Sequence, residues 1–219
     1  MISKKSKISR KFENSSQIKA VLFDMDGVLL DSFEAWCRLF NATLMHFGKK
    51  EITRQQFREG AWARGSKVAS KNFFDGMAVK KIVEFYCEHF NDYKKYVRKM
   101  KDVDIVLKKL KEKGLKLAVI SNGFHKLVRI ILKMGRLEDY FDIVVGTDDV
   151  KNAKPAPDML LYACKKLGIK PEEAVMIGDT KYDVEAGRNA GCLAVGFKTD
   201  GDKRIESLKG LLKIIWRRT

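Results

Sequence analysis

Two carboxylate side chains stand close together in the stretch DMDGVLLDS, where Asp24 and Asp26 follow a short apolar run. Two like charges held side by side repel each other unless a cation or a shared proton compensates them. The pair therefore predicts a bound cation, and Mg²⁺ is the expected one because it prefers oxygen ligands. The alternative is that the tetrapeptide DMDG is an acidic turn that binds no ligand and whose glycine only allows the turn, since short motifs also occur by chance.

A second pair of carboxylates, Asp179 and Asp183, lies in the stretch GDTKYD, directly after the apolar run AVMIG. A spacing of four residues places both side chains on one side of a helical turn. An aspartate at this point can also serve simply as a helix N-cap. If the strands are parallel, both pairs lie at the same edge of the sheet, and the four carboxylates form a site for a hard cation.

Two further strand ends carry groups that suit a phosphate. Ser121 and Asn122 end the run in VISNG, where a hydroxyl and backbone N–H groups could hold a phosphoryl oxygen. A serine that caps the following helix is the alternative. Lys154 in AKPAPD would neutralise charge beside the carboxylates and a phosphate, whereas a lone lysine in a loop is usually solvated.

The elements that must position these residues alternate along the chain. Short, almost continuously apolar runs are typical of strands that are covered on both faces, and they occur at KAVLF (19–23), LKLAVIS (115–121), FDIVVG (141–146), AVMIG (174–178) and CLAVG (192–196). Helical apolar patterns separate the runs from 115 onward. This order predicts an α/β fold with a Rossmann-like parallel sheet flanked by helices.

One segment breaks the alternation. Residues 34–99 show two helical apolar stripes and no strand, which predicts an all-helical cap domain inserted after the first strand. Such a cap lies above the carboxyl ends of the strands, where open α/β sheets bind ligands. The predicted organisation is then a flexible basic arm at 1–17, a catalytic core formed by 18–33 and 100–219, and the cap at 34–99.

Composition limits the classes of partner. The 219 residues include 44 Lys+Arg and 28 Asp+Glu, a net charge of +16 that suggests nucleic acid, an acidic membrane or a phosphorylated small molecule. The four cysteines form no CxxC pair and no zinc-ligand pattern. No apolar run approaches the roughly 18 residues that cross a bilayer, so we expect a cytoplasmic protein without a membrane partner.

Four motifs in this order resemble those of the haloacid dehalogenase-like hydrolase superfamily, in its phosphoglycolate phosphatase-like branch with a helical C1-type cap. The resemblance covers about residues 18 to 200. The matching residues, in motif order, are Asp24 and Asp26, Ser121, Lys154, and Asp179 with Asp183.

The resemblance implies a mechanism. Asp24 attacks phosphorus and becomes an aspartyl-phosphate, while Asp26 acts first as general acid and then as general base. It also implies a Mg²⁺ site formed by Asp24, the backbone carbonyl of Asp26, and Asp179, with Asp183 as a ligand or behind the ligands. Phosphate contacts fall to Ser121, Asn122 and Lys154.

The expected activity is hydrolysis of the phosphate monoester of a small metabolite, of phosphoglycolate or sugar-phosphate type. Family members that act on halides or phosphonates lack an acid at the position of Asp26. A β-phosphoglucomutase-like phosphotransferase is the alternative suggested by KPAPD, although the fourth motif has Gly178, Asp179 and Thr180 where that branch has Glu-Asp-Ser. From another class, the basic arm suggests a nucleic-acid-binding protein.

The cap would set specificity. The polar stretch REGAWARGSK at 58–67 resembles the specificity loop of the family's caps. Its Arg64 and Lys67 could bind an anionic leaving group such as a carboxylate or a second phosphate. A solvated basic loop is the alternative for the same residues.

Overall fold

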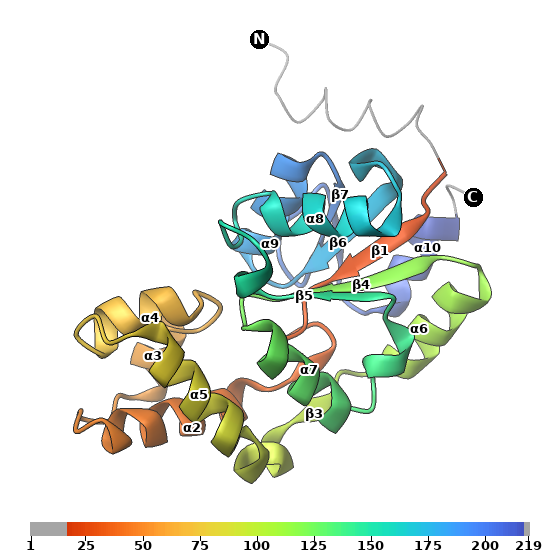
Figure 1. Ribbon diagram of the computed structural model, residues 1–219. Coiled ribbons are helices and arrows are strands. Elements are labelled where there is room, and N and C mark those ends of the chain that lie inside the picture. Colours follow the sequence, from red (N-terminus) through yellow and green to blue (C-terminus); the bar gives the residue numbers. More distant parts are fainter. Residues whose placement is uncertain (1–16, 217–219) are drawn as a thin grey trace.

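The computed structural model describes residues 17–216, which form a parallel sheet flanked by helices with a helical lobe to one side (Figure 1). The six-stranded sheet has the order β5-β4-β1-β6-β7-β8, and every neighbouring pair is parallel. Its strands are β1 (Ala20–Phe23), β4 (Lys116–Ile120), β5 (Ile143–Val145), β6 (Ala174–Gly178), β7 (Leu193–Phe197) and β8 (Lys203–Ile205). The predicted α/β class is confirmed.

Side chains alternate between two apolar layers, one on each face of the sheet. In β1, Val21 and Phe23 join one layer, while Ala20 and Leu22 join the other. The first layer is covered by α6 (Val103–Glu112), α7 (His125–Met134) and α10 (Lys209–Trp216), and the second by α8 (Asp158–Leu167) and α9 (Lys181–Ala190). Burial on both faces explains why the strands read as continuous apolar runs.

Short 3₁₀ turns connect several of these elements. They are η2 (Glu138–Tyr140), η3 (Thr147–Asp149) and η4 (Pro171–Glu173). The edge strand β8 was not predicted from the sequence, because two of its three residues are exposed and charged and give no apolar run.

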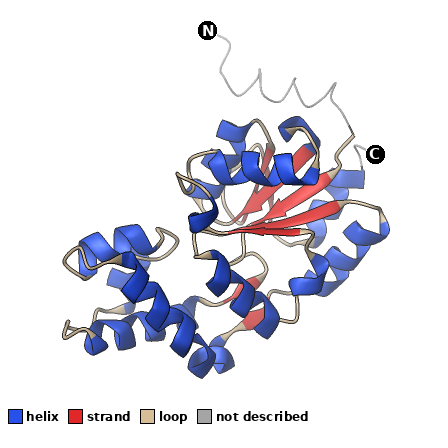
Figure 2. Cartoon of the chain, in the orientation of Figure 1, coloured by secondary structure: helices blue, strands red, loops and turns tan. Residues whose placement is uncertain are grey.

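The helical lobe is formed by the part of the chain that follows one short strand and precedes another (Figure 2). It contains α2 (Phe33–His46), α3 (Arg54–Gly60), α4 (Ser66–Phe73), α5 (Val79–His89) and η1 (Phe90–Tyr96), and we call residues 33–96 the cap. The strands β2 (Leu30–Asp31) and β3 (Arg98–Lys99) pair antiparallel where the chain leaves and re-enters the core. Because both residues of β3 are polar and exposed, the sequence pattern showed no strand there.

Aromatic side chains hold the cap together. The ring of Phe40 lies 5.2 Å from that of Phe57 and 5.5 Å from that of Phe74, and the ring of Phe33 lies 5.1 Å from that of Trp62. Tilted and edge-on rings at these separations attract each other beyond simple burial. These contacts are continuous with the apolar layer on one face of the sheet, so the cap and the core share one apolar cluster.

The two ends of the chain differ in what the structure describes. The predicted basic arm lies almost entirely outside the described residues. At the other end, Leu211 and Ile215 of α10 are buried, so this helix packs on the apolar layer of the core. Within residues 17–216, no helix has both the length and the apolar character needed to span a bilayer.

Candidate active site

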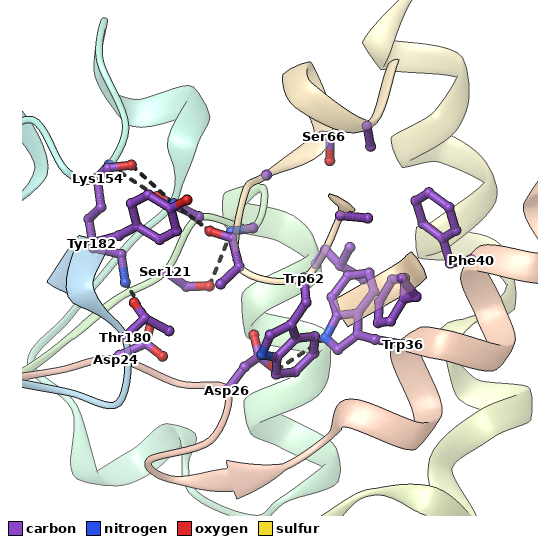
Figure 3. A pocket seen from close by; sticks show the side chains of 18 of the residues that line it. Asp24, Asp26, Trp36, Phe40, Trp62, Ser66, Ser121, Lys154, Thr180 and Tyr182 are labelled. Carbon is purple, nitrogen blue, oxygen red and sulfur yellow. Dashed lines mark hydrogen bonds and ion pairs between the residues drawn. The ribbon is translucent and has the colours of Figure 1, made fainter. Parts of the chain in front are cut away.

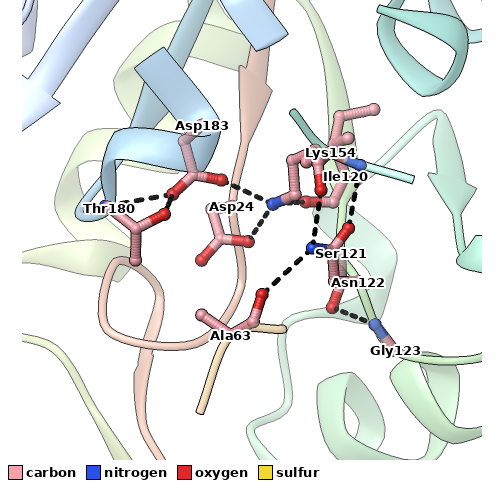
Figure 4. Close-up of polar contacts among 9 residues, drawn as sticks. All are labelled: Asp24, Ala63, Ile120, Ser121, Asn122, Gly123, Lys154, Thr180 and Asp183. Atoms are coloured by element: carbon pink, nitrogen blue, oxygen red, sulfur yellow. Dashed lines mark hydrogen bonds and ion pairs between the residues drawn. The ribbon is translucent and has the colours of Figure 1, made fainter. Parts of the chain in front are cut away.

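A buried lysine is the hub of the polar residues at the carboxyl edge of the sheet (Figure 4). The Nζ of Lys154 donates to Asp24 Oδ1 at 2.6 Å, to Asp183 Oδ1 at 2.6 Å and to the backbone oxygen of Ile120 at 2.8 Å. An ammonium group has three protons to donate, so all of its donors are used. Three segments that are remote in sequence are thereby joined at one point.

The charged groups around Lys154 shift one another's pKa values. Burial alone would lower the pKa of Lys154, but Asp183 and Asp24 more than offset it, so its pKa is raised and the lysine stays charged. Burial raises the pKa of Asp24 well above its ordinary value, although Lys154 acts in the opposite direction. Among the described residues, no group donates a hydrogen bond to the second carboxylate oxygen of Asp24, Oδ2.

Asp26 is oriented by two donors. Its Oδ1 accepts hydrogen bonds from Ser32 Oγ and from the indole Nε1 of Trp36, the latter at 3.1 Å. Burial raises the pKa of Asp26, while these two hydrogen bonds lower it. A carboxyl group with a raised pKa is suited to donating a proton and later accepting one. Trp36 belongs to α2, so the cap itself contacts this carboxylate.

Asp179 is the carboxylate that lacks a partner. Its Oδ1 is buried and has no hydrogen-bond partner among residues 17–216. Burial, followed by the charge of Asp183, raises its pKa to about 7. Gly27 makes room for this side chain, because a Cβ at Gly27 would lie only 2.1 Å from Asp179 Oδ2. The glycine of DMDG is required by this close approach and by its positive φ of 86°.

These carboxylates fit a divalent cation. Oxygens of Asp24, Asp179 and Asp183 lie within 4.8 Å of one another. Three clustered carboxylates, one of them with an unpartnered buried oxygen, form the hard oxygen-donor set that Mg²⁺ prefers. The residues present therefore fit the metal that the sequence predicts.

Asp183 has a second task at the start of α9. Its Oδ2 accepts hydrogen bonds from the backbone N of Thr180 at 3.1 Å and from Thr180 Oγ1 at 2.5 Å. Because its Oδ1 contacts Lys154, both oxygens have partners. The N-cap residue of α9 is therefore Thr180 and not Asp179, and Asp183 makes the reciprocal contact of a capping box. Asp179 takes no part in this cap.

Asn122 links the cap to the core. Its Nδ2 donates to the backbone oxygen of Ala63 at 3.0 Å and to that of Lys154 at 3.3 Å. Its Oδ1 accepts from the backbone N of Lys154 at 3.1 Å. The side-chain amide is therefore committed to positioning two loops. Beside it, Ser121 is buried, and its Oγ accepts from the backbone N of Gly123 at 3.1 Å.

A cavity between core and cap joins these groups (Figure 3). From the core it is lined by polar residues that include Asp24, Asp26, Ser121, Asn122, Lys154, Thr180, Tyr182 and Asp183. Asp179 is not among the lining residues, and its side chain lies next to Gly27. The structure thus brings the predicted carboxylates, Ser121, Asn122 and Lys154 together at one place.

The two predicted specificity residues flank the cavity lining in the sequence but are not part of it. Arg64 and Lys67 are exposed and do not line the cavity, whereas the residues between them, Gly65 and Ser66, do. Their predicted role toward an anionic leaving group stays a prediction.

The residues that sequence reasoning missed are mainly aromatic. Trp36 and Phe40 belong to one of the two helical apolar stripes of residues 34–99, yet they line the cavity together with Phe57, Trp62 and Tyr86. A helical stripe shows that a face is buried, but it gives no sign of whether a cavity lies beneath it.

Known proteins support the family resemblance. The model of the haloacid dehalogenase-like hydrolase family matches residues 21–197. A phosphoglycolate phosphatase of Aquifex aeolicus is 34% identical over 80% of this chain and 82% of its own length, and the pyrophosphatase PpaX of Bacillus cereus is 31% identical over 88% and 90%. The crystal structure of CbbY from Rhodobacter sphaeroides in complex with phosphate shares the fold, with a TM-score of 0.80 at 24% identity over 89% of this chain and 96% of that one.

Proposed function

The chain belongs to the haloacid dehalogenase-like hydrolase family, and we propose that it is a Mg²⁺-dependent phosphatase that hydrolyses the phosphate monoester of a small metabolite. The observation that carries this proposal is the state of Asp24. One oxygen of its carboxylate is held by Lys154 at 2.6 Å, while Oδ2 receives no hydrogen bond from the described residues. A carboxylate that is oriented through one oxygen and free at the other is suited to be a nucleophile.

Asp24 and Asp26 divide the chemistry. In the first half-reaction, Asp24 Oδ2 forms a bond to phosphorus, the ester P–O bond breaks, and Asp26 gives its proton to the leaving alcohol oxygen. In the second, Asp26 takes a proton from water, the water oxygen attacks phosphorus, and the bond to Asp24 breaks. Inorganic phosphate leaves, and both carboxyl groups return to their initial states.

The remaining residues orient the reacting groups and compensate their charge. Lys154 orients Asp24 and compensates the charge of the transferring group, and Ser121 Oγ lines the same part of the cavity. Asn122 keeps the loop of Lys154 in place through its side-chain amide. Phosphate contacts of Asn122 therefore fall to its backbone N–H.

The metal would be held by Asp24, Asp179 and the backbone carbonyl of Asp26. Bound Mg²⁺ would compensate the negative charge on the phosphoryl oxygens. Asp183, whose two oxygens already contact Lys154 and Thr180, stabilises the arrangement behind these ligands.

The size of the cavity supports a small substrate. The cavity has a volume of about 90 Å³, and one water needs roughly 10–15 Å³. This room suits a phosphoryl group with a small leaving group.

Hydrolysis of p-nitrophenyl phosphate with and without Mg²⁺ tests the proposal. We expect Asp24→Asn to lower kcat by about 10⁴-fold or more, because the amide is no nucleophile. Asp139→Asn is the matched control, since Asp139 is exposed on η2 away from the cavity, and it should behave as wild type. Equal turnover by Asp24→Asn and wild type would refute the mechanism.

The phosphotransferase alternative is tested with β-glucose 1-phosphate. We expect release of inorganic phosphate to exceed formation of the 6-phosphate, and the opposite order would favour the mutase. The nucleic-acid-binding alternative rests on the basic arm, which lies outside the described residues apart from Gln17. Salt-sensitive DNA or RNA binding that is lost on deletion of residues 1–17 would support it.

A further inference from the structure

The cavity has two unlike ends (Figure 3). Its core end carries the carboxylates, Lys154 and the hydroxyls of Ser121 and Thr180. Its cap end is formed by aromatic and small side chains, namely Trp36, Phe40, Phe57, Ala61, Trp62, Ala69 and Tyr86, with Ala63, Gly65 and Ser66 beside them. A substrate whose phosphoryl group reaches Asp24 must place its leaving group against this cap end.

No cationic side chain of the cap lines this end within residues 17–216. The basic residues adjacent in sequence to the lining residues are all exposed, and they are Arg58, Arg64, Lys67, Lys126 and Lys181. Arg58 packs over the ring of Phe33, with its guanidinium carbon 4.1 Å from the ring centre. The one cation that does line the cavity, Lys154, already contacts two carboxylates. Among the described lining residues, no unpaired cationic side chain is left for a second anionic group on the substrate.

The energetics then separate two kinds of leaving group. A carboxylate or a second phosphate placed at the cap end would lose its hydration and gain no opposite charge, which strongly disfavours binding. An uncharged apolar group would instead bury surface against aromatic rings. The polar groups available at the cap end are uncharged, and they are Ser66 Oγ, the Tyr86 hydroxyl and the Trp62 indole N–H. None of the three forms a hydrogen bond with another described residue.

We propose that the substrate is a phosphate monoester of an uncharged, largely apolar alcohol, rather than a diphosphate or a phosphorylated carboxylic acid. This inference rests on the proposed phosphatase function and narrows its substrate class. It separates the chain from the relatives named phosphoglycolate phosphatase and pyrophosphatase, whose named substrates carry a second anionic group.

Two matched esters test the proposal in the wild-type protein with Mg²⁺. Isobutyl phosphate and 2-phosphoglycolate release primary alcohols of the same branching and size, which differ in the charge of the branched end. We expect kcat/KM to be roughly 100-fold higher for isobutyl phosphate, because only the glycolate would bury an unpaired charge. Pyrophosphate should be a similarly poor substrate. A kcat/KM for 2-phosphoglycolate or pyrophosphate that equals or exceeds that for isobutyl phosphate overturns the proposal.

A cation placed in the cavity provides the second test. Ser66→Lys should shift the ratio of the two kcat/KM values toward 2-phosphoglycolate by about tenfold or more, whereas Ser66→Gln, of similar length and uncharged, should not. Arg64→Ala and Lys67→Ala should leave the ratio unchanged, since both side chains are exposed. A selective loss of 2-phosphoglycolate hydrolysis in either alanine variant would restore the predicted anion-binding role and refute this proposal.

Binding measurements separate this inference from the proposed function. Isobutylphosphonate and phosphonoacetate are matched in the same way and cannot be hydrolysed as esters. Calorimetry with the wild-type protein and Mg²⁺ should show tighter binding of isobutylphosphonate, and tighter binding of phosphonoacetate overturns the inference. If isobutylphosphonate binds more tightly but no ester is hydrolysed, the phosphatase proposal fails while the preference of the cavity stands.

Discussion

The core and the cap enclose one cavity with opposite chemistries. On the core side, Lys154 contacts Asp24 and Asp183 at 2.6 Å each, so these three charged groups have defined partners. On the cap side, the rings of the lining pairs Phe40–Phe57, Trp36–Tyr86 and Phe57–Trp62 lie 5.2–6.0 Å apart and form a wall of apolar contacts. Ion pairs and hydrogen bonds depend steeply on distance and direction, whereas apolar contact tolerates small shifts. The core side is therefore suited to a fixed reaction, and the cap side to a variable leaving group.

The largest effect is expected from removing the buried cation. Lys154→Met keeps much of the side-chain volume but leaves Asp24 and Asp183 without their shared partner. Breaking a buried ion pair on one side typically costs about 3–5 kcal/mol, so we expect a clear fall in the thermal midpoint together with loss of turnover.

Adding Asp183→Asn to this variant separates stability from catalysis. The double variant has one buried carboxylate fewer, so part of the lost stability should return while turnover stays absent. Thermal unfolding and phosphate release measure the two effects. A Lys154→Met variant as stable as wild type would show that the hub is no stabilising centre.

A smaller effect is expected from crowding Asp179. In Gly27→Ala the new Cβ would collide with the Asp179 carboxylate, which should raise the Mg²⁺ concentration for half-maximal activity by about 10–100-fold. Gly48→Ala is the matched control. Gly48 has a similar positive φ of 69° but no atom within 4 Å of the added Cβ, so it reports the backbone strain alone. An equal Mg²⁺ requirement in both variants would contradict the role assigned to Asp179.

A still smaller effect is expected from removing the hydrogen bond that Trp36 of the cap donates to Asp26, the proposed acid. Trp36→Phe keeps a ring in the cap but removes the hydrogen bond to Asp26, so kcat should fall by about tenfold. Since that hydrogen bond lowers the pKa of Asp26, its loss should move the descending limb of the pH profile of kcat/KM to higher pH. Trp62→Phe is the control, because Trp62 lines the cavity but donates no hydrogen bond to Asp26. Equal pH profiles for the two variants would assign Trp36 to packing alone.

The smallest effect is expected at the opposite edge of the sheet, where a carboxylate serves stability only. Asp142 accepts hydrogen bonds from the backbone N of Leu117 at 2.7 Å and from Lys111 Nζ at 2.9 Å. Burial alone would raise the pKa of Asp142, but these contacts outweigh it, so its pKa is lowered. A lowered pKa in the folded state gives stability that is present above the unfolded value, about 3.9, and is lost as the pH falls.

Acid unfolding of Asp142→Asn checks this contribution. The wild type should lose slightly more stability than the variant between about pH 5 and pH 2, because only the wild type has this carboxylate to protonate. The difference should be small since the side chain is partly exposed. Activity of the folded variant should be unchanged, and a loss of activity would contradict the separation of the two edges.

Much of the fold was predictable because its signals are local. Each strand of the sheet interior is buried on both faces, so β1 and β6 read directly as apolar runs. The carboxyl ends of parallel strands meet at one edge of the sheet, so the sequence alone predicted that Asp24, Ser121 and Asp179 lie close together. The strands β3 and β8 escaped prediction, because short polar strands are set by their neighbours rather than by their own residues.

The amino-acid sequence by itself determined which groups are available for chemistry and at which edge of the sheet they gather. Only the tertiary structure decided how they are used. Asp183 contacts both Lys154 and the N-cap residue Thr180 of α9, and Asp179 keeps an unpartnered oxygen. Arg64 and Lys67 are exposed and do not line the cavity. The physical reason is that residue type and spacing fix which interactions are possible. The partners a side chain finally has depend on distances between segments far apart in the chain, and those are set only when the core and the cap pack.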